Sequence, residues 1–195
     1  MKRYVKSVIA DPSTEERGVK YQIVDNPHTS AAQLAKLSDD PEWEIRFNVA
    51  KHPNTSIDVL RQLADDEHYF VRQGVAFNPN VPVDLLQQLA KDEDYHVRYA
   101  VAQNPKIPMD LLLELSEDRH WGARTGVAEN PNTPVKVLRE LAKHYDYDVR
   151  KAAAKNPNTP IAVIKKLCRD KDFEVRSAAE EAYHEAPGFW FGDEN

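Results

Sequence analysis

Hydrophobic and polar positions along this chain recur with a period of 26 residues, and within each period the apolar residues follow helical spacing. One stripe contains Val135, Leu138 and Leu141, and after a polar stretch a second contains Val149 and Ala153. Gaps of three and four residues place each stripe on one face of a helix. The pattern therefore predicts two amphipathic helices in each period.

A column of prolines, each preceded by Asn or His, repeats with the same period. The prolines are Pro27, Pro53, Pro79, Pro105, Pro131 and Pro157. They belong to six units without insertions or deletions: 19–44, 45–70, 71–96, 97–122, 123–148 and 149–174. Leucine or isoleucine fills the sixteenth position of each unit, and leucine fills the nineteenth. Such a unit cannot bury its apolar stripe alone, so the units are expected to stack into a solenoid.

Start and stop signals support two helices in each unit. In the fifth unit we expect Thr133 to cap the first helix and Pro134 to occupy its first position. Asp146 or Asp148 is expected to cap the second helix, which stops at Asn156 because a proline follows. The second helix is short, which predicts some 3₁₀ character.

The two ends of the chain depart from the repeat. Residues 1–18 predict a capping helix containing Tyr4 and Val8 and then a loop at residues 12–14. Residues 175–195 read as a degenerate half-repeat with an aromatic tail. The tail aromatics are Phe189, Trp190 and Phe191. We expect the tail to cover the last repeat, or alternatively to dock onto another protein or another copy of this chain.

The residues that recur at fixed positions of each unit resemble those of a known repeat family. Residues 149–168 read Val-Arg-Lys-Ala-Ala-Ala-Lys-Asn-Pro-Asn-Thr-Pro-Ile-Ala-Val-Ile-Lys-Lys-Leu-Cys. The combination of Val-Arg, Asn-Pro, Thr-Pro and Leu-x-x-Leu-Ala resembles the leucine-rich repeat variant family over about residues 19–180. The resemblance implies an all-α, right-handed α-solenoid of six repeats with capping ends. Each repeat would hold one α-helix and one short α- or 3₁₀-helix, in the style of HEAT and armadillo repeats.

The resemblance also bears on chemistry. The family implies a binding role and no catalytic residues. One member type carries an iron–sulfur cluster on N-terminal cysteines, but residues 1–20 contain no cysteine. No cluster is therefore implied for this chain.

Composition narrows the class of partner. The chain has 26 Lys and Arg against 32 Asp and Glu, a net charge of −6, which disfavours nucleic acid and anionic membranes. One cysteine, Cys168, excludes an internal disulfide framework and an all-cysteine metal cluster. No apolar run approaches the roughly 18 residues that span a bilayer. The apolar stretch near the N-terminus is too short for a signal peptide. We expect a cytoplasmic protein.

An arginine ladder fills the second position of the units. Its members are Arg46, Arg72, Arg98, Arg124, Arg150 and Arg176. The ladder is either a cationic stripe for an acidic ligand or a set of ion pairs between units, and its uniformity favours the second. The expected acceptors lie four residues before an arginine: Glu42, Asp94, Asp146 and Asp172. A parallel column of asparagines, from Asn26 to Asn156, is expected to stabilise turns.

Two further columns concern packing and binding. The twenty-fifth position is always aromatic, from Trp43 to Phe173, and is expected in the core. The third and seventh positions vary and are expected to face outward on the second helix. We interpret them as a partner-binding surface, comprising Phe47, Lys51, Gln73, Phe77, Tyr99, Gln103, Thr125, Glu129, Lys151 and Lys155. The aromatic members are either a binding hot spot or scattered surface aromatics.

No pattern for catalysis emerges. The sequence has no glycine-rich phosphate loop, and its seven histidines include no pair at metal-ligand spacing. Cys168 occupies a position otherwise held by Ala or Ser and is expected to be a small core residue. We therefore expect no enzyme activity, no metal and no cofactor.

The function that the sequence favours is a non-catalytic repeat scaffold. It would bind a protein or peptide through the variable face of the second helices, as a monomer or with weak self-association. One alternative is a nucleic-acid-binding or HEAT-like base-repair protein that uses the arginine ladder. Another is a module that self-assembles through the aromatic tail.

Overall fold

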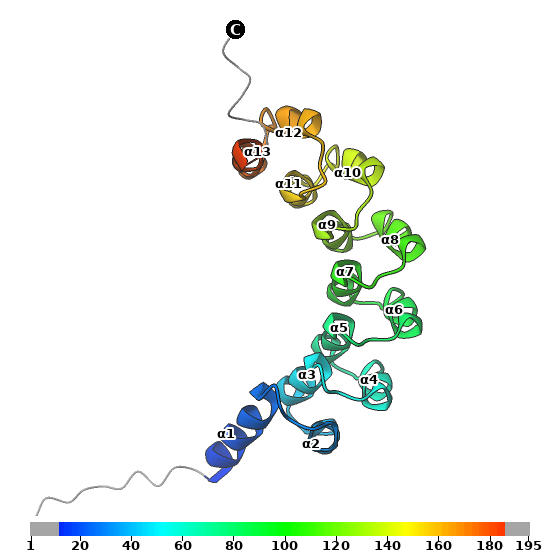
Figure 1. Ribbon diagram of the computed structural model, residues 1–195, viewed down its shortest axis with the longest axis vertical. Helices are drawn as coiled ribbons and strands as arrows, with labels where there is room; N and C mark the ends of the chain where they lie inside the picture. Colours follow the sequence, from blue (N-terminus) through cyan, green and yellow to red (C-terminus); the bar gives the residue numbers. More distant parts are fainter. Residues whose placement is uncertain (1–11, 186–195) are drawn as a thin grey trace, which may run out of the picture.

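The structure is a computed structural model that describes residues 12–185. Every helix or strand assigned in this part of the chain is an α-helix, and there are thirteen of them. The helices alternate between two layers that together form an arc (Figure 1). The expectation of an all-α protein built from repeated helix pairs is confirmed.

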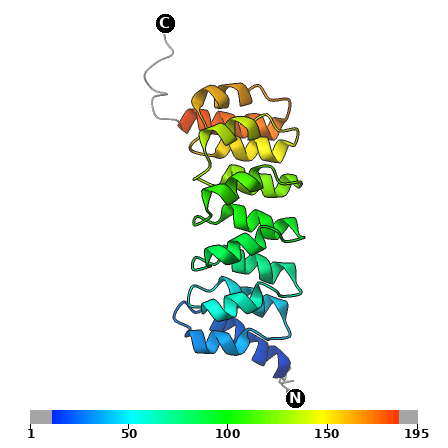
Figure 2. The ribbon, with the colours of Figure 1, turned by 90° about the vertical axis from the view of Figure 1, so that its right-hand side faces the viewer.

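The inner layer lies on the concave side of the arc. It contains α1 (Pro12–Asp25), α3 (Trp43–Lys51), α5 (Tyr69–Phe77), α7 (Tyr95–Gln103), α9 (Trp121–Glu129), α11 (Tyr147–Lys155) and α13 (Phe173–Glu185). The outer layer lies on the convex side. It contains α2 (Ala31–Leu37), α4 (Ile57–Leu63), α6 (Val83–Leu89), α8 (Met109–Ser116), α10 (Val135–Leu141) and α12 (Ile161–Leu167). Figure 2 shows the helices stacked in chain order along the long axis.

Close packing within the inner layer produces the arc. From α3 to α13 each inner helix contacts the next inner helix extensively, whereas neighbouring outer helices contact each other little. Small residues make this approach possible: a Cβ on Gly126 would lie 2.7 Å from the carbonyl oxygen of Tyr99 on the preceding inner helix. The inner helices are therefore closer together than the outer ones, and the stack curves toward them.

The predicted apolar columns form the core. Leu60, Leu86 and Leu138 of the sixteenth position are fully buried, and Leu89 and Leu115 of the nineteenth are nearly so. The inner helices contribute buried valines and alanines. The two layers are therefore joined by one continuous hydrophobic core.

The helix types differ from expectation. Both helices of a pair are α-helical, and the shorter member is the outer one, typically seven residues against nine. The second helix of each unit, expected to be short and partly 3₁₀, is the inner helix. Its length follows from its packing, because it is held by two inner neighbours as well as by the outer layer.

The caps were predicted only in part. Asp146 caps α11 through its side chain, as expected, but α10 begins at Val135 with Pro134 in the N-cap position. Thr133, the predicted cap, is buried and donates from its hydroxyl to the carbonyl oxygen of Val127 at the end of α9. The proline N-cap has no side-chain acceptor, and the threonine ties the turn to the preceding helix instead.

The N-terminal boundary also differs. Residues 12–14, expected in a loop, lie in the first turn of α1, which then continues without a break across the predicted boundary at residue 18. Proline is well suited to a first helical turn, since its missing N–H has no partner there. Residues 1–11 and the tail aromatics Phe189, Trp190 and Phe191 lie outside the described residues.

Candidate functional site

The ladder arginines clamp consecutive loops together. Arg98 on α7 donates from Nε to Asp118 at 2.7 Å and from a second nitrogen at 2.9 Å, so the contact is bidentate. Its third nitrogen donates to the carbonyl oxygens of Asp92 and Glu93. Arg98 thus joins the loop before its own helix to the equivalent loop of the next pair. The same geometry recurs in three further pairs, Arg46–Asp66, Arg72–Asp92 and Arg150–Asp170.

The structural role of the ladder was predicted, but its partners were not. The acceptor carboxylates lie 20 residues after each arginine rather than four before it. Asp94 and Asp146 instead cap their own helices. Burial alone would raise the pKa of Asp118, but the hydrogen bonds from Arg98 and the His120 amide lower it. These arginines are already paired, so the nucleic-acid alternative lacks the free cationic stripe that it requires.

Arg124 is the exception in the ladder. The position 20 residues later holds His144, where the other clamps have an aspartate. The Nε of Arg124 is buried and has no hydrogen-bond partner among the described residues. One guanidinium nitrogen donates to the carbonyl oxygen of Asp118, and the group lies 5.9 Å from the centre of the Tyr145 ring. This step of the ladder therefore lacks its neutralising carboxylate.

The asparagine column does more than stabilise turns. Asn156 accepts the backbone N–H of Asn158, as a turn residue would. Its amide also donates to the carbonyl oxygens of Ala128 and Asn130 in the preceding pair. Its backbone is extended, with φ of −69° and ψ of 127°. The column is a second set of ties between repeats.

The predicted partner-binding residues lie on the inner helices. The third and seventh positions fall on the side opposite the residues that pack against the outer layer, so they line the concave face (Figure 1). Most of these side chains are half-buried, and Lys51, Glu129 and Lys155 are exposed. The concave face is therefore continuous across the inner helices.

Two predicted hot-spot residues have a packing role. A Cβ on Gly74 would lie 3.0 Å from the Phe47 ring, and one on Gly126 would lie 3.0 Å from the Tyr99 ring. These aromatic rings thus cover glycines of the following inner helix. Tyr99 also donates to Glu129 at 2.7 Å, and burial together with this bond raises its pKa. Phe47 and Tyr99 therefore have a packing role, which the sequence pattern did not predict.

Phe77 differs from these two aromatics. It lines a cavity of about 320 Å³ together with Gln103 and Glu129 and the Asn-Pro turns beside them. Gln103 donates to Glu129 across consecutive inner helices. Three predicted residues are thereby brought together around one hollow at the edge of the concave face.

The remaining predicted residues are dispersed along the same face. The Lys51 ammonium lies 5.1 Å from the centre of the Phe47 ring. Gln73 donates to the carbonyl oxygen of His96 at 3.3 Å, and Lys151 forms an ion pair with Glu174. The other two, Thr125 and Lys155, do not join a cluster: Thr125 donates to a carbonyl within its own helix.

Aromatic stacking on the N-terminal part of the inner layer was missed. Trp43 stacks on His68 at 4.3 Å and on Phe70 at 5.0 Å, and Tyr95 stacks on His120 at 3.7 Å. The helical spacing of Phe70 to Gln73 and Phe77 could have placed it on the concave face. The aromatic column itself is only partly in the core, because Tyr147 and Phe173 are 40% and 72% exposed.

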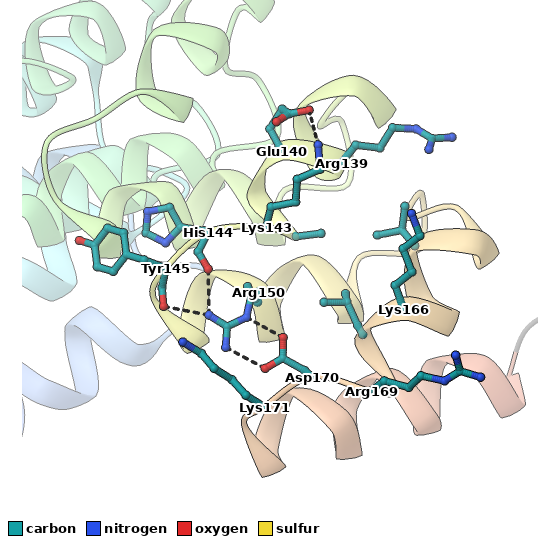
Figure 3. A pocket seen from close by; sticks show the side chains of 13 residues that line it. Arg139, Glu140, Lys143, His144, Tyr145, Arg150, Lys166, Arg169, Asp170 and Lys171 are labelled. Atoms are coloured by element: carbon teal, nitrogen blue, oxygen red, sulfur yellow. Dashed lines mark hydrogen bonds and ion pairs between the residues drawn. The ribbon is translucent and has the colours of Figure 1, made fainter.

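A second hollow lies on the edge where outer helices lead into inner ones. It has a volume of about 660 Å³ and lies between the C-terminal ends of α10 and α12 and the loops that follow them. We call it the basic pocket, because six Lys and Arg line it against two acidic residues. They are Arg139, Lys143, Arg150, Lys166, Arg169 and Lys171, with Glu140 and Asp170. Figure 3 shows Arg150 held between Asp170 and the carbonyl groups of His144 and Tyr145.

Reactive groups are sparse in residues 12–185. No three His, Cys, Asp or Glu side chains gather there as a metal ion requires. Cys168 is half-buried against the core, and burial raises the pKa of its thiol. None of the helices in this range is both long and apolar enough to cross a bilayer.

Comparison with known proteins gives a family for one repeat. Residues 43–68, which contain α3, α4 and the loop toward α5, match the family described as leucine rich repeat variant. No curated protein sequence matches the chain.

The solved structures that resemble this one include two that match over most of the chain. One is described as a leucine-rich repeat variant with a novel repetitive protein structural motif; it is 25% identical, with 85% of this chain and 82% of that chain covered and a TM-score of 0.45. The other is the X-ray structure of YibA from E. coli, at 19% identity, with 93% and 76% covered and a TM-score of 0.59. The second likeness concerns the fold alone.

The matched repeat lies within a regular series of helix pairs. The resemblance read from the sequence is confirmed for residues 43–68, which match the leucine rich repeat variant family, and the described residues around them form a helical repeat.

Proposed function

We propose that this protein is a non-catalytic scaffold that binds a protein or peptide on its concave face. The observation that carries the proposal is the hollow formed by Phe77, Gln103 and Glu129 on an otherwise continuous inner layer. Stacking of repeats supplies an extended surface of this kind. A partner of the concave face would contact residues that differ from repeat to repeat, whereas the ties between repeats stay constant.

The test uses residues outside the arginine clamps, the asparagine ties and the aromatic contacts on glycines. Phe77→Ala, Gln103→Ala and Lys155→Ala are combined in one variant, and Phe47 and Tyr99 are left intact because they pack on glycines. The matched control carries three substitutions at exposed positions of α6 and of the turn that follows it: Val83→Ala, Gln87→Ala and Lys91→Ala. Circular dichroism confirms equal folding of both variants.

Binding is measured by affinity capture from nuclease-treated host lysate and then with the purified partner. A photo-crosslinking residue is placed at Phe77 in one experiment and at Gln87 in another. We expect a partner that crosslinks from position 77, is lost from the concave variant and is kept by the control. A partner that crosslinks only from position 87, or that the concave variant captures fully, would move the site off the concave face.

A further inference from the structure

The basic pocket has more cations than its own acids neutralise. Arg150 is paired with Asp170, and Lys143 with Glu140 at 3.0 Å. The other four cations have no carboxylate within ion-pair distance among residues 12–185. These four are Arg139, Lys166, Arg169 and Lys171. The pocket therefore carries an uncompensated positive charge in a chain whose net charge is −6.

The fold does not require cations at these positions. Each earlier repeat has equivalent positions, at multiples of 26 residues before Lys166, Arg169 and Lys171. In the second repeat the equivalents are Gln62, Asp65 and Glu67. Repeats with neutral or acidic side chains there stack with the same clamps. The positive charge is thus a local property of the fifth and sixth repeats and not of the framework.

One pair of positions forms a hydrogen bond between consecutive repeats elsewhere in the chain, and the basic pocket lacks this bond. Gln62 donates to Asp39 at 2.7 Å, and Gln88 donates to Asp65 at 2.8 Å, so this pair of positions bridges consecutive repeats. In the basic pocket the equivalent residues are Lys166 and Lys143. Two ammonium groups cannot form that bridge, and their repulsion is relieved when an anion lies between them.

The surroundings add to the positive field. Arg124, whose carboxylate partner is replaced by His144, does not line the pocket, but its guanidinium lies 5.9 Å from the ring centre of Tyr145, which does. Burial and the nearby Arg124 lower the pKa of His144, which favours the neutral imidazole. Its Nδ1 accepts the backbone N–H of Asp146.

The shape indicates the kind of anion. The cations are spread around a hollow of about 660 Å³ and do not converge on one point, with Lys166 and Lys171 on either side of Arg150 (Figure 3). Val163 and Leu167 contribute buried apolar side chains to the lining, and Tyr145 is 71% exposed. Several carboxylates interspersed with apolar side chains fit such a site better than a single compact phosphate.

We infer that the basic pocket between α10 and α12 binds an acidic peptide segment of a partner, with carboxylates between Lys143 and Lys166 and apolar side chains on Tyr145 and Leu167. This site is separate from the concave face and does not depend on the function proposed there.

The experiment measures fluorescence anisotropy of a short labelled peptide in which glutamates alternate with leucines. The test variant is Lys166→Gln/Arg169→Gln/Lys171→Gln, all exposed residues without ion pairs. The matched control is Lys36→Gln/Lys91→Gln/Lys106→Gln, which changes the net charge equally at exposed sites elsewhere. We expect the test variant to bind about tenfold more weakly or worse, and the control to bind like the wild type.

Further arms check the chemistry of the ligand. Replacing every glutamate of the peptide by glutamine, or adding about 0.5 M salt, is expected to abolish binding. Backbone amide shifts on titration are expected around residues 142–145 and 166–171. The Phe77 concave variant is expected to bind this peptide normally, so failure at one site is distinguishable from failure at the other.

Four results would overturn the inference. They are unchanged binding by the test variant, equal loss in the control, displacement by inorganic phosphate at matched ionic strength, and equally tight binding of a labelled single-stranded oligonucleotide at the same residues. The last two would assign the pocket to phosphate groups instead of a peptide.

Discussion

The second and third repeats have the same paired helices and hydrophobic core as the fifth and sixth. The two regions differ in the charged residues of the loops that lead from outer to inner helices. In the former, Arg46 and Arg72 are each clamped by an aspartate. In the latter, Arg150 is clamped but Arg124 faces His144 and keeps an unpartnered Nε. The charge of the two regions differs as well, since residues 123–174 contain eleven Lys and Arg against seven Asp and Glu, whereas residues 45–96 contain five against eight.

The difference separates what stacking requires from what it tolerates. Buried leucines, asparagine ties and most clamps recur in both regions, because every interface must bury the same stripe and satisfy the same carbonyl groups. At exposed loop positions, by contrast, the sign of the side-chain charge differs from one repeat to another. A repeat protein thereby provides its own internal control, and a departure from the common pattern marks a place where another requirement acts.

The largest expected effect tests whether the hydrophobic framework is equal in the two regions. Leu89→Ala and Leu141→Ala each remove a leucine of the same column, at 2% and 4% exposure. We expect each to lower the free energy of unfolding by about 2–5 kcal/mol through loss of burial and cavity formation. Urea denaturation measures both. A much smaller effect of Leu141→Ala would show that the C-terminal region is loosely packed, and the comparison would then concern packing as well as charge.

A reciprocal exchange tests the clamp itself. Asp118→His should leave the buried guanidinium of Arg98 unpaired and lower the free energy of unfolding by about 2–4 kcal/mol. His144→Asp should supply Arg124 with the missing carboxylate and raise it by about 1–2 kcal/mol. Thermal and urea denaturation of both variants give the two values.

The exchange has a matched control. His144→Asn introduces a side chain of the same shape without the charge and should gain much less than His144→Asp. If His144→Asp is no more stable than the wild type, then Arg124 does not need a carboxylate partner at position 144.

The smallest expected effect is a dependence of stability on pH that comes from His144, which stands where the other clamps have an aspartate. The pKa of His144 is lowered from 6.5 in the fold, so the unfolded chain takes up the proton first. Its contribution to stability is therefore complete above about pH 6.5 and is lost as the pH falls through the lower folded value. We expect the melting temperature of the wild type to fall more between about pH 7.5 and 5.5 than that of His144→Gln. The contribution of His120, also lowered, is common to both proteins. If the melting temperatures of the two proteins changed equally with pH, the dependence would not come from His144.

The clamp aspartates act in a lower range. The pKa of Asp66 and of Asp118 is lowered from 3.8, so their contribution is present above about pH 4 and is lost as the pH falls further. Acid should therefore weaken the clamped interfaces only below the range in which His144 acts.

Several elements of the fold were predictable because they depend on local patterns. The periodic leucines and prolines located the helix pairs and the core, and uniformity of the ladder indicated a structural role for Arg98 and its equivalents. Asp146 was identified as a cap because capping involves neighbours in sequence. Among the candidate binding residues, helical spacing alone placed Phe77, Gln103 and Glu129 on one face.

The tertiary structure decided everything that depends on how one repeat lies against the next. It set the partner of each arginine 20 residues downstream, it placed Phe47 and Tyr99 over glycines, and it put the inner helices on the concave side. It also gathered Lys143, Lys166 and Lys171 around one pocket. The sequence by itself determined the unit and its buried stripe, since hydrophobic periodicity is local. The curvature, the clamps and the charged pocket arise only when units stack, because each is made by side chains of different repeats.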